Sequence, residues 1–312
     1  MATIMEKVCI LLSTYNGEKY VETLIDSIIA QQNVSVNLLV RDDGSKDGTI
    51  GILQNYVSEN PNIVLLKESF GQNFGVAKSF WFLLKSGEQM FSDIDYFFFA
   101  DQDDYWLEDK CCRAVDSLIT YKNGPVLYFS RKKLVDEYLN PLSQKDIIQL
   151  TNNFWDFFDR SNAFGCTMCM TRDLIHLLGN DSFYEHPFLH DNYIYRLCLA
   201  GNIPIVYDDK ETIFYRQHGN NVEGAVKRNV FRGIIRLFKK SRVHIIREMS
   251  RYILETHYDI VTKHNRAILE LLLDSYTSFK SKMKLIKSYN QQHCRTLKEK
   301  ILFSAMIITN YF

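Results

Sequence analysis

One short apolar run ends in a cluster of acids, and this feature most constrains the fold. Residues Tyr96 to Ala100 are apolar and mostly aromatic, and three aspartates, Asp101, Asp103 and Asp104, follow within four positions. Such a run, bounded by polar residues, is typical of a strand buried on both faces. The acids therefore lie where the strand leaves the sheet, which is the edge where open α/β sheets bind ligands.

The spacing of Asp101 and Asp103 suits a bound cation. Side chains of an extended chain alternate in direction, so these two carboxylates can point the same way and offer oxygen ligands to a divalent ion. Such an ion could bridge the two phosphates of a nucleotide diphosphate and neutralise charge as the diphosphate departs. The alternative is an acidic turn in water, which is what most acid clusters are.

Strands and helices alternate through the N-terminal half. Four strands are predicted, at 8–12, 36–40, 63–66 and 96–100. Apolar residues at helical spacing predict three helices between them, within 18–32, 47–57 and 76–84. Short connections of this kind join parallel strands, so we expect an α/β fold with a mostly parallel sheet and helices on both faces.

Polar loops follow each of these strands. They lie at 13–17, 42–45, 71–75 and 101–104. Because the carboxyl ends of parallel strands meet at one edge, the four loops should form a single site. A dinucleotide site is not indicated, since the loop after the first strand contains only Gly17 and no Walker sequence is present.

Composition bounds the class of protein. The 312 residues are 46% hydrophobic, and 37 Lys and Arg balance 37 Asp and Glu, which gives no general attraction to nucleic acid. The seven cysteines are odd in number and scattered, and no secretory signal opens the chain, so we expect reduced thiols and a cytoplasmic location. Cys166 and Cys169 have metal or redox spacing, but buried apolar cysteines are the favoured interpretation.

Three motifs carry a family resemblance. Ser13-Thr-Tyr-Asn-Gly17, Asp42-Asp-Gly-Ser45 and Asp101-Gln-Asp-Asp-Tyr-Trp106, in this order, resemble the family 2 glycosyltransferases, which have a GT-A, Rossmann-like fold. The likeness covers roughly residues 6 to 225. His190-Asp191 and the run from Tyr215 to Asn221 make the chain similar to the bacterial rhamnosyltransferase-like members, which elongate cell-surface polysaccharides.

The resemblance implies a nucleotide site. Tyr15 would stack on the base, and Asp43 would accept a hydrogen bond from the N3–H of uracil or thymine, which excludes purines. Asp42 and Ser45 would support that turn or contact the ribose, and Lys78 would pair with the phosphates. The other residues assigned to nucleotide binding are Ser13, Thr14, Asn16, Asp101 and Gln102.

The resemblance also implies a metal site for Mg²⁺ or Mn²⁺. Asp101 and Asp103 would be the paired aspartates, and Asp103 is favoured for direct metal contact. Asp104 would support them or cap a helix. A polar loop containing Arg216 and His218 could close over the donor and offer Arg216 to the diphosphate or His218 to the metal.

Inverting transfer also needs a base on the acceptor side. A carboxylate in a cleft can take the proton of the attacking hydroxyl, and Asp191 is the candidate. An N-cap role for Asp191 is the compatible alternative. Many relatives have Glu-Asp where this chain has His190-Asp191, so His190 could orient the base.

The sugar and acceptor pocket is assigned to a loop and to aromatic rings. The loop of Gly165, Cys166 and Thr167 resembles the family's pocket-lining loop, and His190 and Arg216 are assigned to the same pocket. Trp106 and Trp155 could stack on sugar faces, although core packing is the alternative for each.

The C-terminal region has a different character. Nine Lys and Arg between 227 and 251 alternate with apolar residues at helical spacing, which predicts a basic amphipathic helix. It could lie on an anionic membrane surface, or pack with its basic face in water. We therefore expect a transferase domain at 1–225 and a helical region at 226–312 that contacts membrane, acceptor or a second copy in a homodimer.

These patterns together predict a glycosyltransferase. It would move a sugar, with rhamnose favoured, from a UDP- or dTDP-sugar to a hydroxyl of a glycan or lipid-linked saccharide, with inversion and with a divalent metal. Its expected location is the cytoplasm, where it could lie at the inner face of the membrane. The main alternative is a catalytically inactive nucleotide-sugar-binding partner subunit. A retaining transferase or a nucleotide-sugar hydrolase is a further alternative.

Overall fold

The computed structural model describes most of the chain. The described residues are 5–67, 71–121, 124–143, 153–158, 163–179, 188–218, 245–292 and 295–310. Their packing divides the chain into two compact units. The first comprises Met1–Ile148, Asn162–Tyr195 and Pro204–Val222, and the second comprises Gln149–Ser161, Arg196–Ile203 and Glu223–Phe312.

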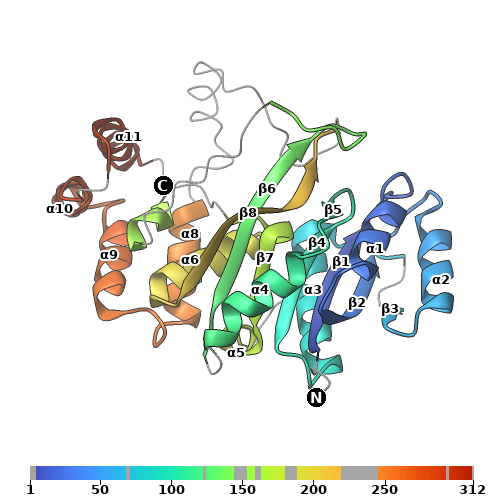
Figure 1. The fold of residues 1–312 in the computed structure, drawn as a ribbon. Helices are drawn as coiled ribbons and strands as arrows, with labels where there is room; N and C mark the ends of the chain where they lie inside the picture. Colours follow the sequence, from blue (N-terminus) through green and yellow to red (C-terminus); the bar gives the residue numbers. More distant parts are fainter. Residues whose placement is uncertain are drawn as a thin grey trace. The chain divides into compact units, whose positions relative to one another are not determined.

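The first unit is built on one eight-stranded sheet. Its strands are β1 (Glu6–Thr14), β2 (Val34–Asp42), β3 (Ile63–Leu65), β4 (Tyr96–Asp101), β5 (Tyr105–Trp106), β6 (Leu127–Val135), β7 (Met168–Thr171) and β8 (Ile205–Arg216). Their order across the sheet is β3-β2-β1-β4-β7-β6-β8-β5 (Figure 1). The four strands predicted from the N-terminal half are β1 to β4, and each is confirmed.

The sheet is parallel in one part and mixed in the other. β2, β1 and β4 run parallel side by side, and β3 runs parallel to β2. β7 is antiparallel to both β4 and β6, whereas β6 runs parallel to β8. The register places Ser13 opposite both Arg41 and Asp101. The carboxyl ends of β1, β2 and β4 therefore lie at one level, which positions the predicted polar loops together.

Helices cover both faces of the parallel part. Val8, Ile10 and Leu12 face a core shared with α1 (Val21–Ile29), α2 (Thr49–Glu59) and α4 (Lys110–Leu118). On the other face lies α3 (Gly75–Met90), so close that a Cβ added at Gly87 would sit 2.9 Å from Cδ2 of Leu11. Alternate residues of β1 thus serve opposite layers, as a strand buried on both faces requires.

Two further helices belong to this part of the chain. They are α5 (Arg172–Leu177) and α6 (His190–Gly201), and α6 contributes residues to both units. The six described cysteines are free, and Cys166 and Cys169 are buried as predicted.

The second unit is helical, as the sequence predicted. It contains α8 (Ile245–Thr256), α9 (Lys263–Asp274), α10 (Phe279–Asn290) and α11 (Leu297–Ile308). Threonine or serine hydroxyls accept the N-terminal amides of α9, α10 and α11, which satisfies helix ends that would otherwise lack partners. Among the described residues, no helix combines the length and apolar character needed to cross a bilayer.

Most of the predicted basic amphipathic helix lies outside the described residues. Of its nine basic residues, only Arg247 and Arg251 fall within the described chain, in α8. Arg247 is buried, and its guanidinium lies over the ring of Tyr276.

Aromatic packing and one ion pair hold the second unit together. The rings of Tyr289 and Phe303 stack 3.8 Å apart, and Trp155 packs edge-on against both. Trp155 is buried here, so its ring does not present a face for a sugar. Beside this cluster Arg295 donates to Oδ1 of Asp156 at 2.6 Å, with both side chains only 4% exposed.

We expect Arg295→Met to lower the free energy of unfolding by about 3–5 kcal/mol, because it removes the guanidinium from a buried carboxylate. The matched control is Arg251→Met, which breaks an Arg251–Glu248 pair whose side chains are 47% and 52% exposed and should cost less than about 1 kcal/mol. Urea denaturation followed by circular dichroism measures both. Equal losses for the two variants would contradict this account of the buried pair.

Candidate active site

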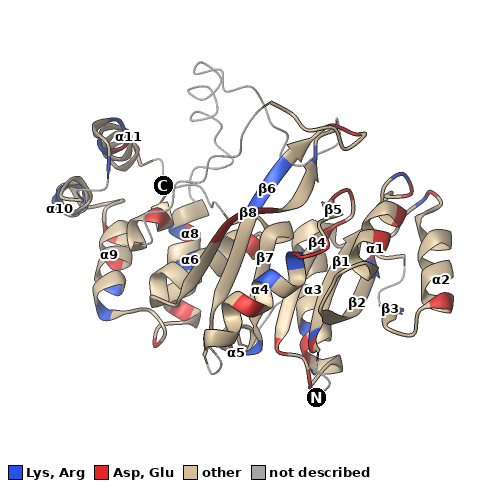
Figure 2. Cartoon of the chain, viewed as in Figure 1, with Lys and Arg blue, Asp and Glu red and all other residues tan. Residues whose placement is uncertain are grey.

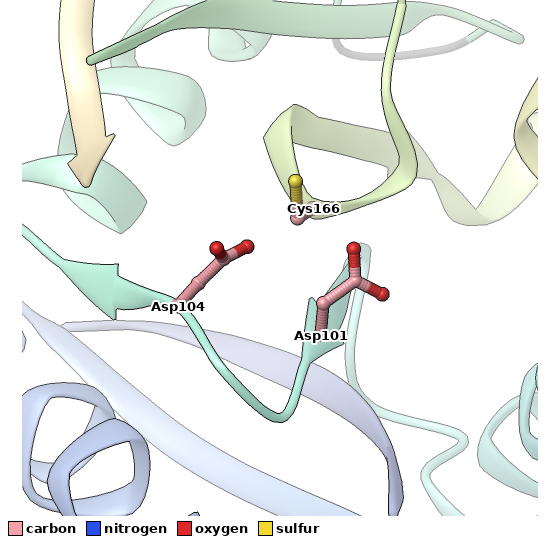
Figure 3. Close-up of side chains that lie close together, drawn as sticks. All are labelled: Asp101, Asp104 and Cys166. Atoms are coloured by element: carbon pink, nitrogen blue, oxygen red, sulfur yellow. The ribbon is translucent and has the colours of Figure 1, made fainter. Parts of the chain in front are cut away.

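Two carboxylates and a thiol converge where β4 ends. The ligand atoms of Asp101, Asp104 and Cys166 lie within 4.8 Å of one another, and Figure 3 shows their side chains pointing into a common space. Asp101 closes β4, and Asp104 follows a turn in which its amide donates to the Asp101 carbonyl at 3.4 Å. Cys166 comes from the short helix Gly165–Thr167 that precedes β7.

This turn changes the predicted pairing of the aspartates. Alternation along an extended chain would place Asp101 and Asp103 together, but the chain turns at 102 and 103, so Asp104 joins Asp101 instead. Asp103 faces the end of β8, where its Oδ2 lies 2.7 Å from Nε2 of His218. The structure therefore brings together Asp103 and His218, two of the three predicted metal ligands. The third, Asp101, lies in the neighbouring cluster with Asp104 and Cys166.

The crowded negative charge perturbs these groups. Burial, together with the charges of Asp103 and Asp191, raises the pKa of Asp101 to about 7. Burial and the charges of Asp103 and Asp101 hold the pKa of Asp104 well above its usual range. Within the described chain Oδ2 of Asp104 is buried and has no hydrogen-bond partner, an arrangement that is costly for a carboxylate. A divalent cation suits these acids, since carboxylate oxygens are the ligands that Mg²⁺ and Mn²⁺ prefer.

Arg216 fixes the position of the acidic turn. Arg216 donates from its backbone amide to Oδ1 of Asp104 at 3.3 Å and from Nε to the carbonyl of Asp103 at 2.8 Å. Its guanidinium also contacts the carbonyl of Glu137 and lies 4.5 Å from the ring centre of Tyr20. Arg216 was expected to meet the diphosphate, and here it holds the acidic turn against β8.

Two loops on the nucleotide side are joined by Gln102. The amide of Tyr15 donates to Oε1 of Gln102 at 2.8 Å, and Nε2 of Gln102 donates to the Tyr15 carbonyl at 2.9 Å. A Cβ added at Gly17 would lie 2.3 Å from the same Oε1, so a side chain there would displace the Gln102 amide from these hydrogen bonds. The Tyr15 side chain remains 47% exposed and can receive a stacked base.

Asp42 supports the turn after β2, which is one of its two predicted roles. Its carboxylate accepts from the hydroxyls of Thr14 and Ser45 and from the amides of Gly44 and Ser45, all within 3.0 Å. The Asn16 amide donates to Oγ of Ser45, which ties this turn to the loop after β1. Ser13, the second-to-last residue of β1, pairs with Asp101 of β4.

Asp43 connects the same turn to the loop at 71–75. Its Oδ1 accepts from Arg41 and from the Phe74 amide, and its Oδ2 accepts from the Gly75 amide at 2.8 Å. Arg41 is completely buried and also donates to Oγ of Ser79. Oδ2 of Asp43 has capacity for one more hydrogen bond. Lys78 lies exposed in the first turn of α3.

Asp191 lies in the first turn of α6 and faces the acidic cluster. Its Oδ2 accepts from the Gly165 amide at 3.2 Å, and its charge contributes to the raised pKa of Asp101. Because α6 begins at His190, Asp191 is inside the helix and is not its N-cap. Thr167, the last residue of the short helix, is buried and donates to the Phe164 carbonyl.

His190 is buried between aromatic rings. Its ring lies 4.3 Å from the rings of Phe80 and Phe99, and burial lowers its pKa to about 4. Neither ring nitrogen has a hydrogen-bond partner among the described residues. A Cβ added at Gly165 would sit 2.6 Å from Nε2 of His190, so the neutral ring and the glycine fit closely.

Trp106 is not available to a sugar in this structure. It is fully buried, with its ring 5.9 Å from Phe98 and 4.6 Å from the ammonium of Lys110. The expectation that Trp106 lines the sugar pocket is therefore corrected, because β5 pairs with β8 and buries the ring in the core.

Sequence reasoning missed three residues that shape the site. Lys110 is fully buried and donates to the Cys166 carbonyl at 2.9 Å, which fixes the thiol-bearing turn. The ammonium of Lys132 is buried over the ring of Phe164 and opposes the rise in the pKa of Asp101. Tyr20 stacks on His218 at 5.1 Å. An isolated Lys or Tyr carries no pattern that distinguishes such roles.

The raised pKa of Asp101 predicts a pH-dependent stability in the presence of a chelator. The pKa rises from 3.8 to about 7 on folding, so the protonated carboxyl stabilises the fold fully below pH about 4, and this contribution is lost as the pH rises through about 7. The free energy of unfolding of wild type, measured relative to that of Asp101→Asn, should therefore fall by about 2–4 kcal/mol as the pH rises from about 4 to about 7. Urea denaturation across this range measures it, and a constant difference would contradict the assignment.

Comparisons with known proteins agree with the fold and the motifs. The family model for glycosyl transferase family 2 matches residues 9–178. The dTDP-rhamnosyl transferase RfbG of Shigella flexneri is 30% identical over 226 residues, which are 69% of this chain and 74% of that protein.

Solved structures show the same fold. TarS of S. aureus, residues 1–349 in complex with UDP, superposes with a TM-score of 0.56 at 16% identity, over 98% of this chain and 80% of that one. The mannosyltransferase PcManGT from Pyrobaculum calidifontis, in complex with GDP-Man and Mn²⁺, gives 0.51 at 16% identity over 99% and 82%. The predicted GT-A-like α/β fold with C-terminal helices is confirmed, and the chain belongs to glycosyl transferase family 2 and is a glycosyltransferase.

Proposed function

We propose that this enzyme transfers a deoxyhexosyl group, with rhamnose as the first candidate, from a dTDP- or UDP-sugar to a hydroxyl of a glycan or lipid-linked saccharide in cell-surface polysaccharide synthesis. The observation that carries the proposal is the gathering of Asp101, Asp103, Asp104 and Asp191 around one site. The similarity to a dTDP-rhamnosyl transferase supports the choice of base and sugar.

The nucleotide would lie across the ends of β1 and β2. The exposed ring of Tyr15 would stack on the pyrimidine, and the remaining lone pair on Oδ2 of Asp43 would accept the N3–H. This contact selects uracil or thymine, because a purine would extend too far for the same pocket. Lys78, exposed on α3, would meet the phosphates.

Asp103 and His218 would hold a Mg²⁺ or Mn²⁺ ion, with Asp101 beside them, since Asp103 and His218 already lie 2.7 Å apart and the charge of Asp103 acts on Asp101. The bound cation would supply electrostatic stabilisation of the leaving diphosphate. Tyr20 would keep the His218 ring in place by stacking.

Asp191 would act as the base in a single displacement with inversion. The acceptor oxygen bonds to the anomeric carbon while the bond from that carbon to the diphosphate oxygen breaks, and the hydroxyl proton passes to the Asp191 carboxylate. The Gly165 amide holds one oxygen of this carboxylate, so the side chain is oriented before the acceptor binds.

We further propose that the enzyme works at the cytoplasmic face of the membrane, where a lipid-linked acceptor would be reached. Support comes from the basic, apolar sequence between 226 and 251, of which 226–244 lie outside the described residues. A homodimer formed by the C-terminal helices remains a prediction from the sequence.

Asp191→Asn tests the proposed function. The amide keeps the shape and the Gly165 hydrogen bond but cannot accept the proton, so we expect kcat to fall by about 10²–10⁴-fold while the Kd for dTDP stays within about twofold. The control is Asp173→Asn, which changes another aspartate in the first turn of a helix, α5, and should leave kcat unchanged.

The assay follows sugar transfer from dTDP-rhamnose and from UDP-sugars to a saccharide acceptor. Wild-type protein that binds dTDP and transfers nothing from any donor would indicate the inactive partner subunit instead. An Asp191→Asn variant with near-normal kcat would contradict the role of the base, and retention at the anomeric carbon would contradict the single displacement.

A further inference from the structure

Helices α10 and α11 of the second unit carry a surface that is both apolar and basic. Six large apolar side chains on these helices are between 42% and 75% exposed: Phe279, Met283, Leu297, Ile301, Leu302 and Ile308. Four exposed lysines lie on the same helices: Lys280, Lys284, Lys287 and Lys298. We call these ten residues the α10–α11 surface.

The two helices that carry this surface pack closely against each other. Tyr289 of α10 stacks on Phe303 of α11, and Leu285 and Ile307 are buried beside them. A capping box formed by Thr296 and Glu299 fixes the start of α11. The outward apolar side chains are therefore not needed for packing between the helices, and they are held in a fixed arrangement.

The apolar part is continuous along α11. Leu297, Ile301 and Ile308 recur at helical spacing on one face. With Ser304 and Ala305 they line a shallow, mostly apolar hollow. Large exposed apolar areas on a soluble surface are typical of sites that meet another surface.

The charge on this surface has one sign. Residues 279–310 contain seven Lys and Arg and one acid, Glu299. Arg295 is committed to the buried pair with Asp156, and Glu299 is committed to the cap of α11. Figure 2 shows basic residues on both helices. The lysines that remain give the surface a positive potential next to its apolar side chains.

The positive charge of the α10–α11 surface distinguishes between two binding partners, a second copy of this chain and an anionic bilayer. A second copy of this chain, docked about a two-fold axis, would bring the same patch against itself and oppose lysine to lysine. A bilayer containing anionic lipid meets both requirements, because its headgroups attract lysines and its acyl boundary takes up apolar side chains. Each lysine near such a surface adds to the electrostatic attraction.

We propose that the α10–α11 surface docks on an anionic phospholipid bilayer. The inference rests on the proposed function in one respect, since a lipid-linked acceptor gives the docking its purpose. The α10–α11 surface would be a second membrane contact, in addition to the basic sequence at 226–251, and all ten of its residues are described by the structure.

Vesicle flotation of the full chain tests the proposal. The probes are vesicles of phosphatidylglycerol with phosphatidylethanolamine, and vesicles of phosphatidylcholine alone. Wild type should bind the anionic vesicles and not the neutral ones, and high salt should weaken the binding. Lys284→Glu with Lys287→Glu should reduce partitioning by at least about tenfold, since two attractive charges become repulsive.

Two further variants separate charge, apolar contact and folding. Leu297→Ser with Ile301→Ser should reduce partitioning by a similar factor without changing net charge. Lys210→Glu with Lys263→Glu makes the same charge change at exposed positions outside α10 and α11 and should lower binding much less. Circular dichroism checks that each variant is folded.

The proposal is overturned if both α10–α11 variants, correctly folded, bind anionic vesicles as wild type does, because the basic sequence at 226–251 would then suffice. It is also overturned if these variants turn a dimer into a monomer in light scattering and leave vesicle binding unchanged. Sugar transfer to a soluble acceptor is measured in parallel. If wild type transfers no sugar, the proposed function is contradicted. Vesicle binding is measured independently of sugar transfer and tests only the docking proposal.

Discussion

Repulsion among four carboxylates is the constraint on which the rest of the site depends. Asp101, Asp103, Asp104 and Asp191 come from the end of β4, the turn after it and the start of α6, and burial, reinforced by the neighbouring carboxylates, raises the pKa of Asp101 and Asp104. The protein offsets this cost with groups that position the acids: Arg216 binds the acidic turn, and Lys110 fixes the adjacent Cys166 turn. What remains uncompensated is negative charge beside His218, which suits a divalent cation and, through it, a diphosphate.

The loops of the nucleotide side are rigid for a related reason. Arg41 is completely buried, and a buried charge must be paired. Its contacts with Asp43, Ser79 and the Gln72 carbonyl fasten the loop at 71–75 to the end of β2. Gln102 fastens the loop after β1 to the acidic turn in the same way. A bound nucleotide would therefore meet a preformed surface, with the Tyr15 ring as its exposed platform, and little ordering would be needed on binding.

Much of this arrangement could be predicted from the sequence, and the exceptions have physical causes. Periodicity identified β1 to β4 because each is a buried run followed by polar residues. It did not identify β6, because Ser130 to Lys133 interrupt its apolar run, or β7, because this strand is only four residues long. The extended chain assumed between Asp101 and Asp103 is replaced by a turn at 102 and 103, which brings Asp104 next to Asp101. Trp106 was assigned to the sugar pocket because the sequence does not report that β5 pairs with β8. Lys110 and Lys132 are buried by packing that no local pattern reveals.

Binding of Mn²⁺ in the presence of dTDP tests the central claim most directly. Electron paramagnetic resonance of Mn²⁺ titrated with protein reports the free ion, so the bound fraction can be followed for wild type and for Asp103→Asn. The account predicts one Mn²⁺ per chain whose affinity rises with dTDP, a loss of at least about tenfold in Asp103→Asn since a charged ligand is removed, and no change in Asp93→Asn, a surface aspartate paired with Lys7. Equal Mn²⁺ binding by wild type and Asp103→Asn, or none by either, would contradict it.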